Sequence, residues 1–221
     1  MTEPSYLSAT RVAYDTVAAD YAELLSDSLA KSTLDRAMLG AFAERVQTGG
    51  NGAVADLGCG PGRITAHLRA LGLTAFGVDL SPEMIAVARR TYPGLRFDEG
   101  LLTSLEIEDG ALSGVVAWYS IIHTPPELLP EIFTEFERVL APGGHLLLTF
   151  QVGDNEVRHI SQGYGHDISL DAHRLSPERD TELLSKAGLV VDAQLLREPG
   201  EKETVPQAYL LARKTRGVGL P

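Results

Sequence analysis

The sequence predicts an α/β fold of the doubly wound kind, with a mostly parallel seven-stranded sheet, a terminal antiparallel hairpin and N-terminal cap helices. Short apolar runs alternate with segments of helical periodicity between residues 53 and 150, which is typical of a parallel sheet covered by helices on both faces. A glycine-rich turn follows the first apolar run. Two extended runs, 189–196 and 207–214, follow near the end, and their spacing predicts a hairpin.

The beginning of the chain predicts two helices that act as a cap. Tyr14 and Tyr21 belong to a set of apolar positions that recur at intervals of three and four, which indicates one helix within the first thirty residues. A second helix is expected over about 34–46. The glycine-rich segment 49–52 ends this pair of helices.

Five apolar runs predict the strands of the central sheet, and helices connect most of them. The expected strands are 53–57, 73–78, 95–97, 115–121 and 145–150. The fourth run is almost wholly apolar, as expected for a strand that is covered on both faces. Ser81 and Pro82 open one connecting helix, with serine as the N-cap and proline in the first turn.

We expect one domain over residues 1–221, because this length suits a single α/β domain. The expected parts are cap helices at 1–48, a cofactor-binding core at 53–150, a polar insert at 151–175 that forms a lid and acceptor wall, and the last helix with the terminal hairpin at 176–214.

The composition argues against several kinds of partner. The net charge is −11 and the cationic clusters are short, whereas nucleic-acid binding needs clustered Lys and Arg, so we expect no nucleic-acid partner. We also expect no membrane partner, because the sequence has neither a basic, apolar leader nor an apolar stretch of spanning length. The single Cys59 cannot form an internal disulfide, which favours a cytoplasmic location.

The segment Asp56-Leu57-Gly58-Cys59-Gly60-Pro61-Gly62-Arg63 carries the strongest functional signal. It lies between the first strand and its helix, at the sheet edge where open α/β folds bind ligands. Gly58 and Gly60 permit a tight turn and let a ligand approach bare backbone. Asp79 ends the second strand, where an acid can accept hydrogen bonds from the ribose hydroxyls of an adenosine.

Details of this turn distinguish between adenosine ligands. A dinucleotide-binding turn reads G-x-G-x-x-G, but its third glycine is replaced here by Arg63, and a glycine comes one residue early, at Gly62. Asp56 puts an anion beside the turn, which suits a ligand with an ammonium and a sulfonium better than a pyrophosphate. A phosphate-binding P-loop is not expected either, since no Gly-Lys-Ser/Thr follows.

With these motifs the chain resembles the class I S-adenosylmethionine-dependent methyltransferases. The resemblance implies a Rossmann-like methyltransferase fold with S-adenosyl-L-methionine as the cofactor. In that family a D-x-G-x-G-x-G turn holds the methionine half of the cofactor, and Asp56, Gly58, Gly60 and Gly62 match it. Asp79 matches the ribose-binding acid of the family.

The resemblance extends to neighbouring segments. It places Leu80 against the adenine, with Met84 nearby. The segment 118–123, which includes Tyr119, resembles the fourth-strand motif that borders the transferred methyl, and 138–144 resembles the R-x-L-x-P-G-G turn.

One feature departs from the family. Relatives often carry Gly-Asp after the third strand, with the carboxylate on the adenine amino group, whereas this chain has Gly100-Leu101. That contact must come from backbone or from elsewhere. The candidate cofactor-binding residues are Tyr14, Tyr21, Asp56, Gly58, Gly60, Gly62, Arg63, Asp79, Leu80, Met84, Leu101, Leu102 and Tyr119.

The sequence leaves two possible roles open for each of several tyrosines and histidines. Tyr14 and Tyr21 either pack or cover the cofactor, and the resemblance implies that a tyrosine hydroxyl reaches the methionine carboxylate. His123 either starts a helix or acts as a pocket base. His166 is either a solvated loop residue or part of the acceptor wall. His159, His166 and His173 are spaced seven residues apart, too widely to predict a metal site.

We therefore expect S-adenosylmethionine-dependent methyl transfer to a small organic molecule, by in-line displacement. His123 and His166 are the candidate catalytic bases, needed only if the acceptor arrives protonated. The alternatives are a non-catalytic S-adenosylmethionine-binding protein and a nicotinamide-dependent oxidoreductase. The sequence identifies neither the acceptor and its methylated atom nor the oligomeric state.

Overall fold

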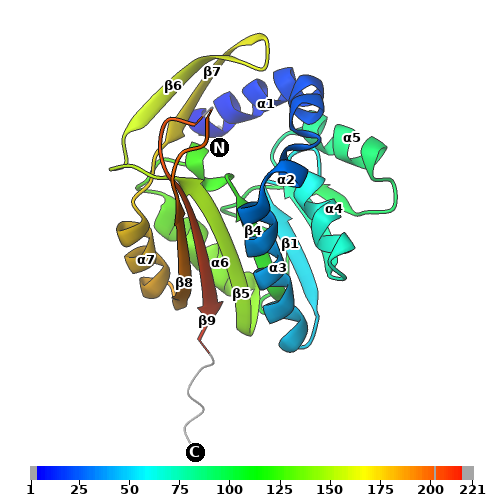
Figure 1. Cartoon of the computed structure of the whole chain (residues 1–221), viewed down its shortest axis with the longest axis vertical. Helices are drawn as coiled ribbons and strands as arrows, with labels where there is room; N and C mark the ends of the chain where they lie inside the picture. Colours follow the sequence, from blue (N-terminus) through cyan, green and yellow to red (C-terminus); the bar gives the residue numbers. More distant parts are fainter. Residues whose placement is uncertain (1–3, 202, 216–221) are drawn as a thin grey trace, which may run out of the picture.

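The computed structural model describes residues 4–201 and 203–215, and it confirms the predicted α/β fold (Figure 1). Seven strands form one sheet in the order β3-β2-β1-β4-β5-β9-β8. β9 runs antiparallel to β5 and β8, and the other neighbours are parallel. The strands are β1 (Ala53–Leu57), β2 (Thr74–Asp79), β3 (Phe97–Glu99), β4 (Leu112–Trp118), β5 (Leu140–Gln151), β8 (Leu189–Arg197) and β9 (Gln207–Lys214). Residues 1–3, 202 and 216–221 of the expected domain lie outside the described part.

Seven α-helices and one 3-10 helix accompany these strands in the described part of the chain. They are α1 (Ser5–Leu25), α2 (Ser28–Lys31), α3 (Thr33–Thr48), α4 (Arg63–Ala70), α5 (Pro82–Thr91), η1 (Ile121–His123), α6 (Leu129–Val139) and α7 (Pro177–Lys186). Ser81 caps α5 as predicted, since its hydroxyl accepts from the Met84 N–H at 3.1 Å. The single helix expected within the first thirty residues is divided into α1 and α2 by a turn at residues 26–27.

The sheet has an apolar core on each face, because successive side chains of a strand point to opposite sides. Val115 packs among residues of α6 and α7, whereas Val116 packs among residues of α3 and α4. Both valines are fully buried, which explains why the predicted fourth strand is apolar throughout. That strand ends at Trp118, earlier than predicted, because Tyr119 adopts a left-handed φ of 55°.

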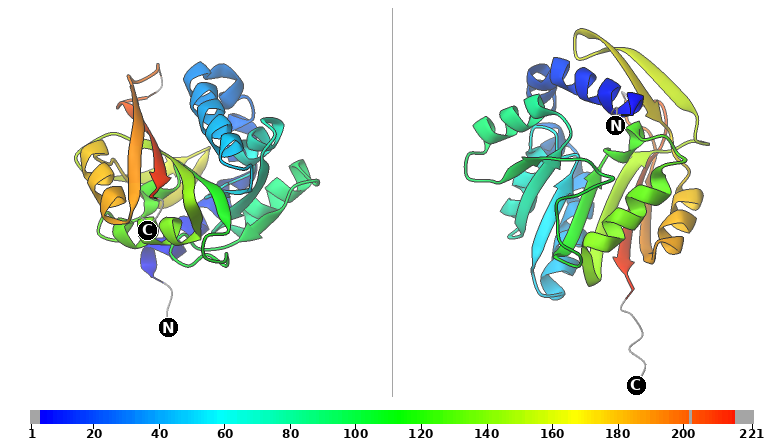
Figure 2. Two further views of the ribbon diagram at one scale, coloured as in Figure 1. Left: turned by 90° about the horizontal axis from the view of Figure 1, so that it is seen from below. Right: turned by 180° about the vertical axis from the view of Figure 1, so that it is seen from behind.

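Helix α1 lies across the carboxyl edge of the parallel strands, and a separate hairpin lies outside it (Figures 1 and 2). The hairpin consists of β6 (Val157–Gly163) and β7 (His166–His173), which pair with each other in antiparallel register. The sequence predicts no strands over 151–175. Ile168 of β7 packs against the cluster that Val17 and Ala18 of α1 form with Met84 and Val87, so the insert covers the helix that covers the sheet edge.

Two glycines near α3 give opposite predictions for stability. A Cβ at Gly114 in β4 would lie 2.7 Å from Phe42 Cζ and 3.0 Å from Val46 Cγ2, both on α3. Gly114→Ala should therefore lower the free energy of unfolding by about 1–3 kcal/mol through overpacking.

The matched control is Gly40→Ala in the middle of α3, where a Cβ would meet nothing within 4 Å. Alanine at that position should raise the free energy of unfolding by about 0.5–1 kcal/mol, because glycine loses more backbone entropy in a helix. Urea unfolding of both variants measures this difference, and equal effects would contradict the packing of α3 on β4.

Candidate functional site

A cavity of about 770 Å³, counting the space that opens to solvent, lies beneath α1 at the carboxyl edge of the sheet. Its walls come from α1, the turn after β1, the ends of β2, β3 and β4, η1 and α6. Eleven of the predicted site residues line it: Tyr14, Tyr21, Gly58, Gly60, Asp79, Leu80, Met84, Leu101, Leu102, Tyr119 and His123. Its size and mixed polar and apolar walls suit a small-molecule site.

The turn between β1 and α4 brings bare backbone to the cavity. Gly58 and Gly60 have φ of 75° and 53°, a left-handed conformation that glycine adopts without strain. A Cβ at Gly58 would lie 2.2 Å from Ser120 Cβ, so this glycine also lets β1 and the end of β4 approach closely. A Cβ at Gly60 would have only Met84 and Tyr21 near it, each at 3.9 Å, because Gly60 faces the cavity.

Gly62 serves packing and does not line the cavity. A Cβ there would lie 2.6 Å from Phe97 Cζ. The neighbouring Arg63 begins α4 and lies against Tyr21. Burial raises the pKa of Tyr21, and the Arg63 charge partly offsets this. Gly62 therefore supports the turn, and Arg63 supports Tyr21, and neither residue is part of the cavity wall.

Asp79 presents a hydrogen-bonding carboxylate to the cavity. Its Oδ2 accepts from the Gly60 N–H at 2.7 Å, and its Oδ1 accepts from the Ser81 N–H at 2.8 Å. These two bonds fix the carboxylate, and each oxygen keeps a further lone pair for a ligand donor. Burial raises the pKa of Asp79 above its ordinary value, and the two backbone donors act against that rise.

Asp56 lies behind the glycine turn, fully buried, and does not line the cavity. The Thr65 hydroxyl donates to its Oδ2 at 2.7 Å, while Oδ1 has no hydrogen-bond partner. Burial raises the pKa of this carboxyl to about 7. A cation bound at the turn would favour the ionised form, so this orphaned oxygen fits a positively charged ligand.

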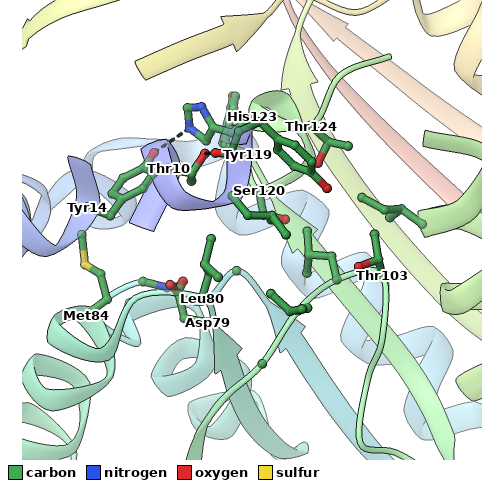
Figure 3. A pocket seen from close by; sticks show the side chains of 18 of the residues that line it. Thr10, Tyr14, Asp79, Leu80, Met84, Thr103, Tyr119, Ser120, His123 and Thr124 are labelled. Atoms are coloured by element: carbon green, nitrogen blue, oxygen red, sulfur yellow. Dashed lines mark hydrogen bonds between the residues drawn. The ribbon is translucent and has the colours of Figure 1, made fainter. Parts of the chain in front are cut away.

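Tyr14 and His123 form a hydrogen-bonded pair above the cavity, on the side opposite Asp79 and Leu80 (Figure 3). The Tyr14 hydroxyl lies 2.7 Å from His123 Nε2, and His123 Nδ1 lies 2.8 Å from the Asp171 carbonyl oxygen. His123 is 8% exposed, and burial lowers its pKa to about 4. The imidazole is therefore neutral at neutral pH.

The structure places His166 away from the cavity. Its Nε2 lies 2.7 Å from Asp20 Oδ2, on the outer side of α1, and it is not among the residues of the cavity wall. Near it, the Tyr164 ring packs on Tyr21 with centroids 4.8 Å apart. His166 thus connects the insert to α1 and does not join His123.

Several wall residues were missed by the sequence analysis. Ser120 is the most informative, because its buried Oγ has no partner and it abuts Gly58. Its place directly after Tyr119 in the fourth-strand motif could have indicated it. Tyr6, Thr10 and Ile132 also line the cavity, but only the folding of α1 and α6 over the sheet edge brings them there, and no local pattern reports that.

Among the residues that the structure describes, no group of three or more His, Cys, Asp or Glu side chains is arranged to hold a metal ion. Within the same residues, no helix is both long enough and apolar enough to cross a membrane. The polar groups that the cavity wall offers are backbone, carboxylate, hydroxyl and imidazole groups.

An adenosyl-methionine ligand fits these groups. Asp79 can accept from ribose hydroxyls, Leu80 and Met84 offer apolar surface to a base, and Gly60 has no side chain to fill the space beside the turn. The unpartnered Ser120 hydroxyl lies in the cavity wall, and the unpartnered oxygen of Asp56 lies behind the turn, where its charge would favour a cationic ligand.

Comparison with known proteins agrees with this fit. Residues 54–144 match the family model described as a methyltransferase domain. The chain is similar to demethylmenaquinone methyltransferase of Chlorobaculum parvum, 36% identical over 92 residues, which are 41% of this chain and 37% of that protein. It is similar to trans-aconitate 2-methyltransferase of Methylobacterium nodulans, 39% identical over 116 residues, which are 50% of this chain and 42% of that protein. The chain thus spans less than half the length of these curated relatives.

Solved structures show the same fold. Burkholderia thailandensis 1,6-didemethyltoxoflavin-N1-methyltransferase, solved with 1,6-didemethyltoxoflavin and S-adenosylhomocysteine bound, superposes with a TM-score of 0.71 over 97% of this chain and 92% of that chain, at 20% identity. At this identity the likeness establishes the arrangement of helices and strands.

The buried His123 predicts a pH dependence of stability. Its pKa of about 4 in the folded protein lies below the value near 6.5 of an unfolded histidine, so the unfolded chain binds the additional proton between these values. The free energy of unfolding should therefore fall as pH drops from 7 to 5, by about 2 kcal/mol from this residue alone.

Urea unfolding of the wild type and His123→Gln at pH 7 and pH 5 measures this contribution as a difference. Burial also raises the pKa values of Asp56 and Asp180 to about 7, which gives the opposite slope, but both carboxyls are present in both proteins. The same pH dependence in both proteins would contradict a buried, neutral His123.

Proposed function

We propose that the chain is a class I S-adenosylmethionine-dependent methyltransferase, which binds S-adenosylmethionine beneath α1 and transfers the methyl group to a small organic acceptor. The match of residues 54–144 to a methyltransferase-domain model and the shared fold support this proposal. One observation carries this proposal: a single cavity is lined by the ribose-type acid Asp79 and bare Gly60 on one side and by the Tyr14–His123 pair on the other. The first pair suits the adenosyl-methionine, and the second lies where an acceptor can be held against it.

In the proposed complex Asp79 accepts from the ribose, and Leu80 with Met84 contacts the adenine. The methionine half lies along Gly58 and Gly60. Tyr21 is the residue that suits its carboxylate, since Tyr21 lines the cavity beside Gly60 and Arg63 lies against Tyr21 from outside the cavity wall. Tyr14 is less suited to that role because its hydroxyl is bonded to His123.

Bound S-adenosylmethionine supplies an electrophilic methyl carbon on a positively charged sulfur, which leaves as a neutral thioether. The main contribution of the protein is then to position the acceptor. Holding an acceptor atom about 3 Å from that carbon, in line with the leaving sulfur, removes much of the activation barrier to methyl transfer. Helix α1 covers the cavity and limits the access of water, and the hairpin lies outside that helix. His123 is the proposed base for an acceptor that arrives protonated.

The relatives support a small acceptor without identifying it. Their names give demethylmenaquinone, trans-aconitate and 1,6-didemethyltoxoflavin as acceptors, which differ widely in charge and shape. The acceptor of this chain must therefore be inferred from its own cavity walls. A cytoplasmic location is part of the proposal, supported by the single, buried and unpaired Cys59.

Ligand binding tests the proposal directly. S-adenosylhomocysteine should bind and raise the melting temperature, and NAD should not. Asp79→Ala should weaken the binding by about 1–3 kcal/mol, the scale of hydrogen bonds to a charged group. Calorimetry with both ligands measures the affinities.

Asp98→Ala is the matched control, because Asp98 is a nearby acid of β3 that pairs with Arg96 at the surface, away from this cavity. It should bind S-adenosylhomocysteine like the wild type. Stabilisation by NAD alone would favour the oxidoreductase. Binding without methyl transfer to any acceptor in a broad panel of small molecules would favour a non-catalytic binder.

A further inference from the structure

The hydrogen bonds around His123 determine that the Tyr14 hydroxyl acts as a donor to His123. The Asp171 carbonyl oxygen can only accept, so the His123 Nδ1 that lies 2.8 Å from it carries the proton. Nε2 of the neutral ring is then an acceptor, and the Tyr14 hydroxyl donates to it at 2.7 Å. Tyr14 lines the cavity, and the proton of its hydroxyl oxygen is already donated to His123. It therefore offers only lone pairs, and a ligand must bring an O–H or N–H to it.

Apart from Asp79, the side chains that line the cavity in the described part of the chain are neutral, and they include the hydroxyls of Thr10, Ser120 and Thr124. Tyr6 and Leu7 of α1, Tyr119 after β4 and Ile132 of α6 line it. Burial raises the pKa of Tyr119 and keeps its hydroxyl neutral, just as burial keeps His123 neutral. The carboxylate in the cavity wall, Asp79, would repel an anion. Such walls favour a neutral ring compound over a carboxylate or phosphate.

We propose that the methyl acceptor is a neutral aromatic compound bearing a hydroxyl group, which donates to the Tyr14 oxygen and loses its proton through Tyr14 to His123. This inference rests on the proposed function, and it adds the acceptor class and the path of the proton. Tyr14 is the group that touches the acceptor, and His123 acts through it as a positioning residue and proton store.

Atoms and charge are conserved in the proposed proton transfer. As the acceptor oxygen takes the methyl carbon, its O–H bond breaks and the bonding electrons remain on that oxygen. The proton moves to the Tyr14 oxygen, while the proton of Tyr14 moves to His123 Nε2. The positive charge lost from sulfur ends on the imidazolium, so the charge within the cavity is conserved. The imidazolium returns its proton to solvent when the product leaves.

A weak base is adequate for this path. Burial lowers the pKa of His123 to about 4, so the ring is free to accept at neutral pH. The hydroxyl itself becomes strongly acidic as the new carbon–oxygen bond forms, because a protonated ether is a far stronger acid than an imidazolium. The proton therefore moves only during methyl transfer, and the pair does not need to ionise the acceptor beforehand.

The test uses the full chain loaded with S-adenosylhomocysteine and two probes that share a ring system, 2-naphthol and 2-methoxynaphthalene. The wild type should bind 2-naphthol about tenfold more tightly than its methyl ether, because only the naphthol can donate to Tyr14. Tyr14→Phe should abolish this preference while binding S-adenosylhomocysteine normally. Tyr164→Phe removes a hydroxyl from a tyrosine outside the cavity wall, and it should keep the preference.

The possible results distinguish a failure of the proposed function from a failure of the inference about the acceptor. No binding of S-adenosylhomocysteine to the wild type overturns the proposed function itself. Normal S-adenosylhomocysteine binding overturns this inference if the preference is absent, if it persists in Tyr14→Phe, if neither probe binds, or if 2-naphthoate binds more tightly than 2-naphthol. The nitrogen chemical shifts of His123 give a second readout: a proton on Nδ1 is expected, and a proton on Nε2 would reverse the polarity of Tyr14 and overturn the inference.

Discussion

Helix α1 is held across the carboxyl edge of the sheet by a small apolar contact and a few hydrogen bonds. Val17 and Ala18 are buried against Met84 and Val87 of α5, and Asp15 accepts from the Ser81 hydroxyl at 2.5 Å. Without this helix the turn after β1 would face solvent, and the groups that suit a cofactor would have no opposite wall. The cavity, the Tyr14–His123 pair and the docking of the hairpin all depend on this one placement.

The sheet and the cofactor half of the site could be predicted from the sequence because their signals are local. Most of the parallel strands are apolar runs bounded by turn residues, and the seven predicted strands form the sheet. Gly58, Gly60 and Asp79 belong to two consecutive strand ends, which meet at one sheet edge in any doubly wound fold. Their contact, with Asp79 accepting from the Gly60 N–H, follows from that topology.

The rest of the site depends on distant segments, and its signals are absent from any short window. The strands of the hairpin escape prediction because β6 has no fully buried side chain, so no alternation of apolar and polar residues marks it. The spacing of His159 and His166 says nothing about their partners, and His166 meets Asp20 on α1. The sequence predicts that His123 lies near the ligand, but its hydrogen bond to Tyr14 forms only because α1 folds over the sheet edge.

The anchor of the His123 ring has a consequence for how this protein can evolve. Nδ1 is held by the main-chain carbonyl of residue 171, and the Asp171 side chain points instead to His159. Since every amino acid supplies the same carbonyl, the tautomer of His123 is insensitive to mutation at that position. A substitution at residue 171 can therefore change the surface of the hairpin without changing which nitrogen of His123 carries the proton.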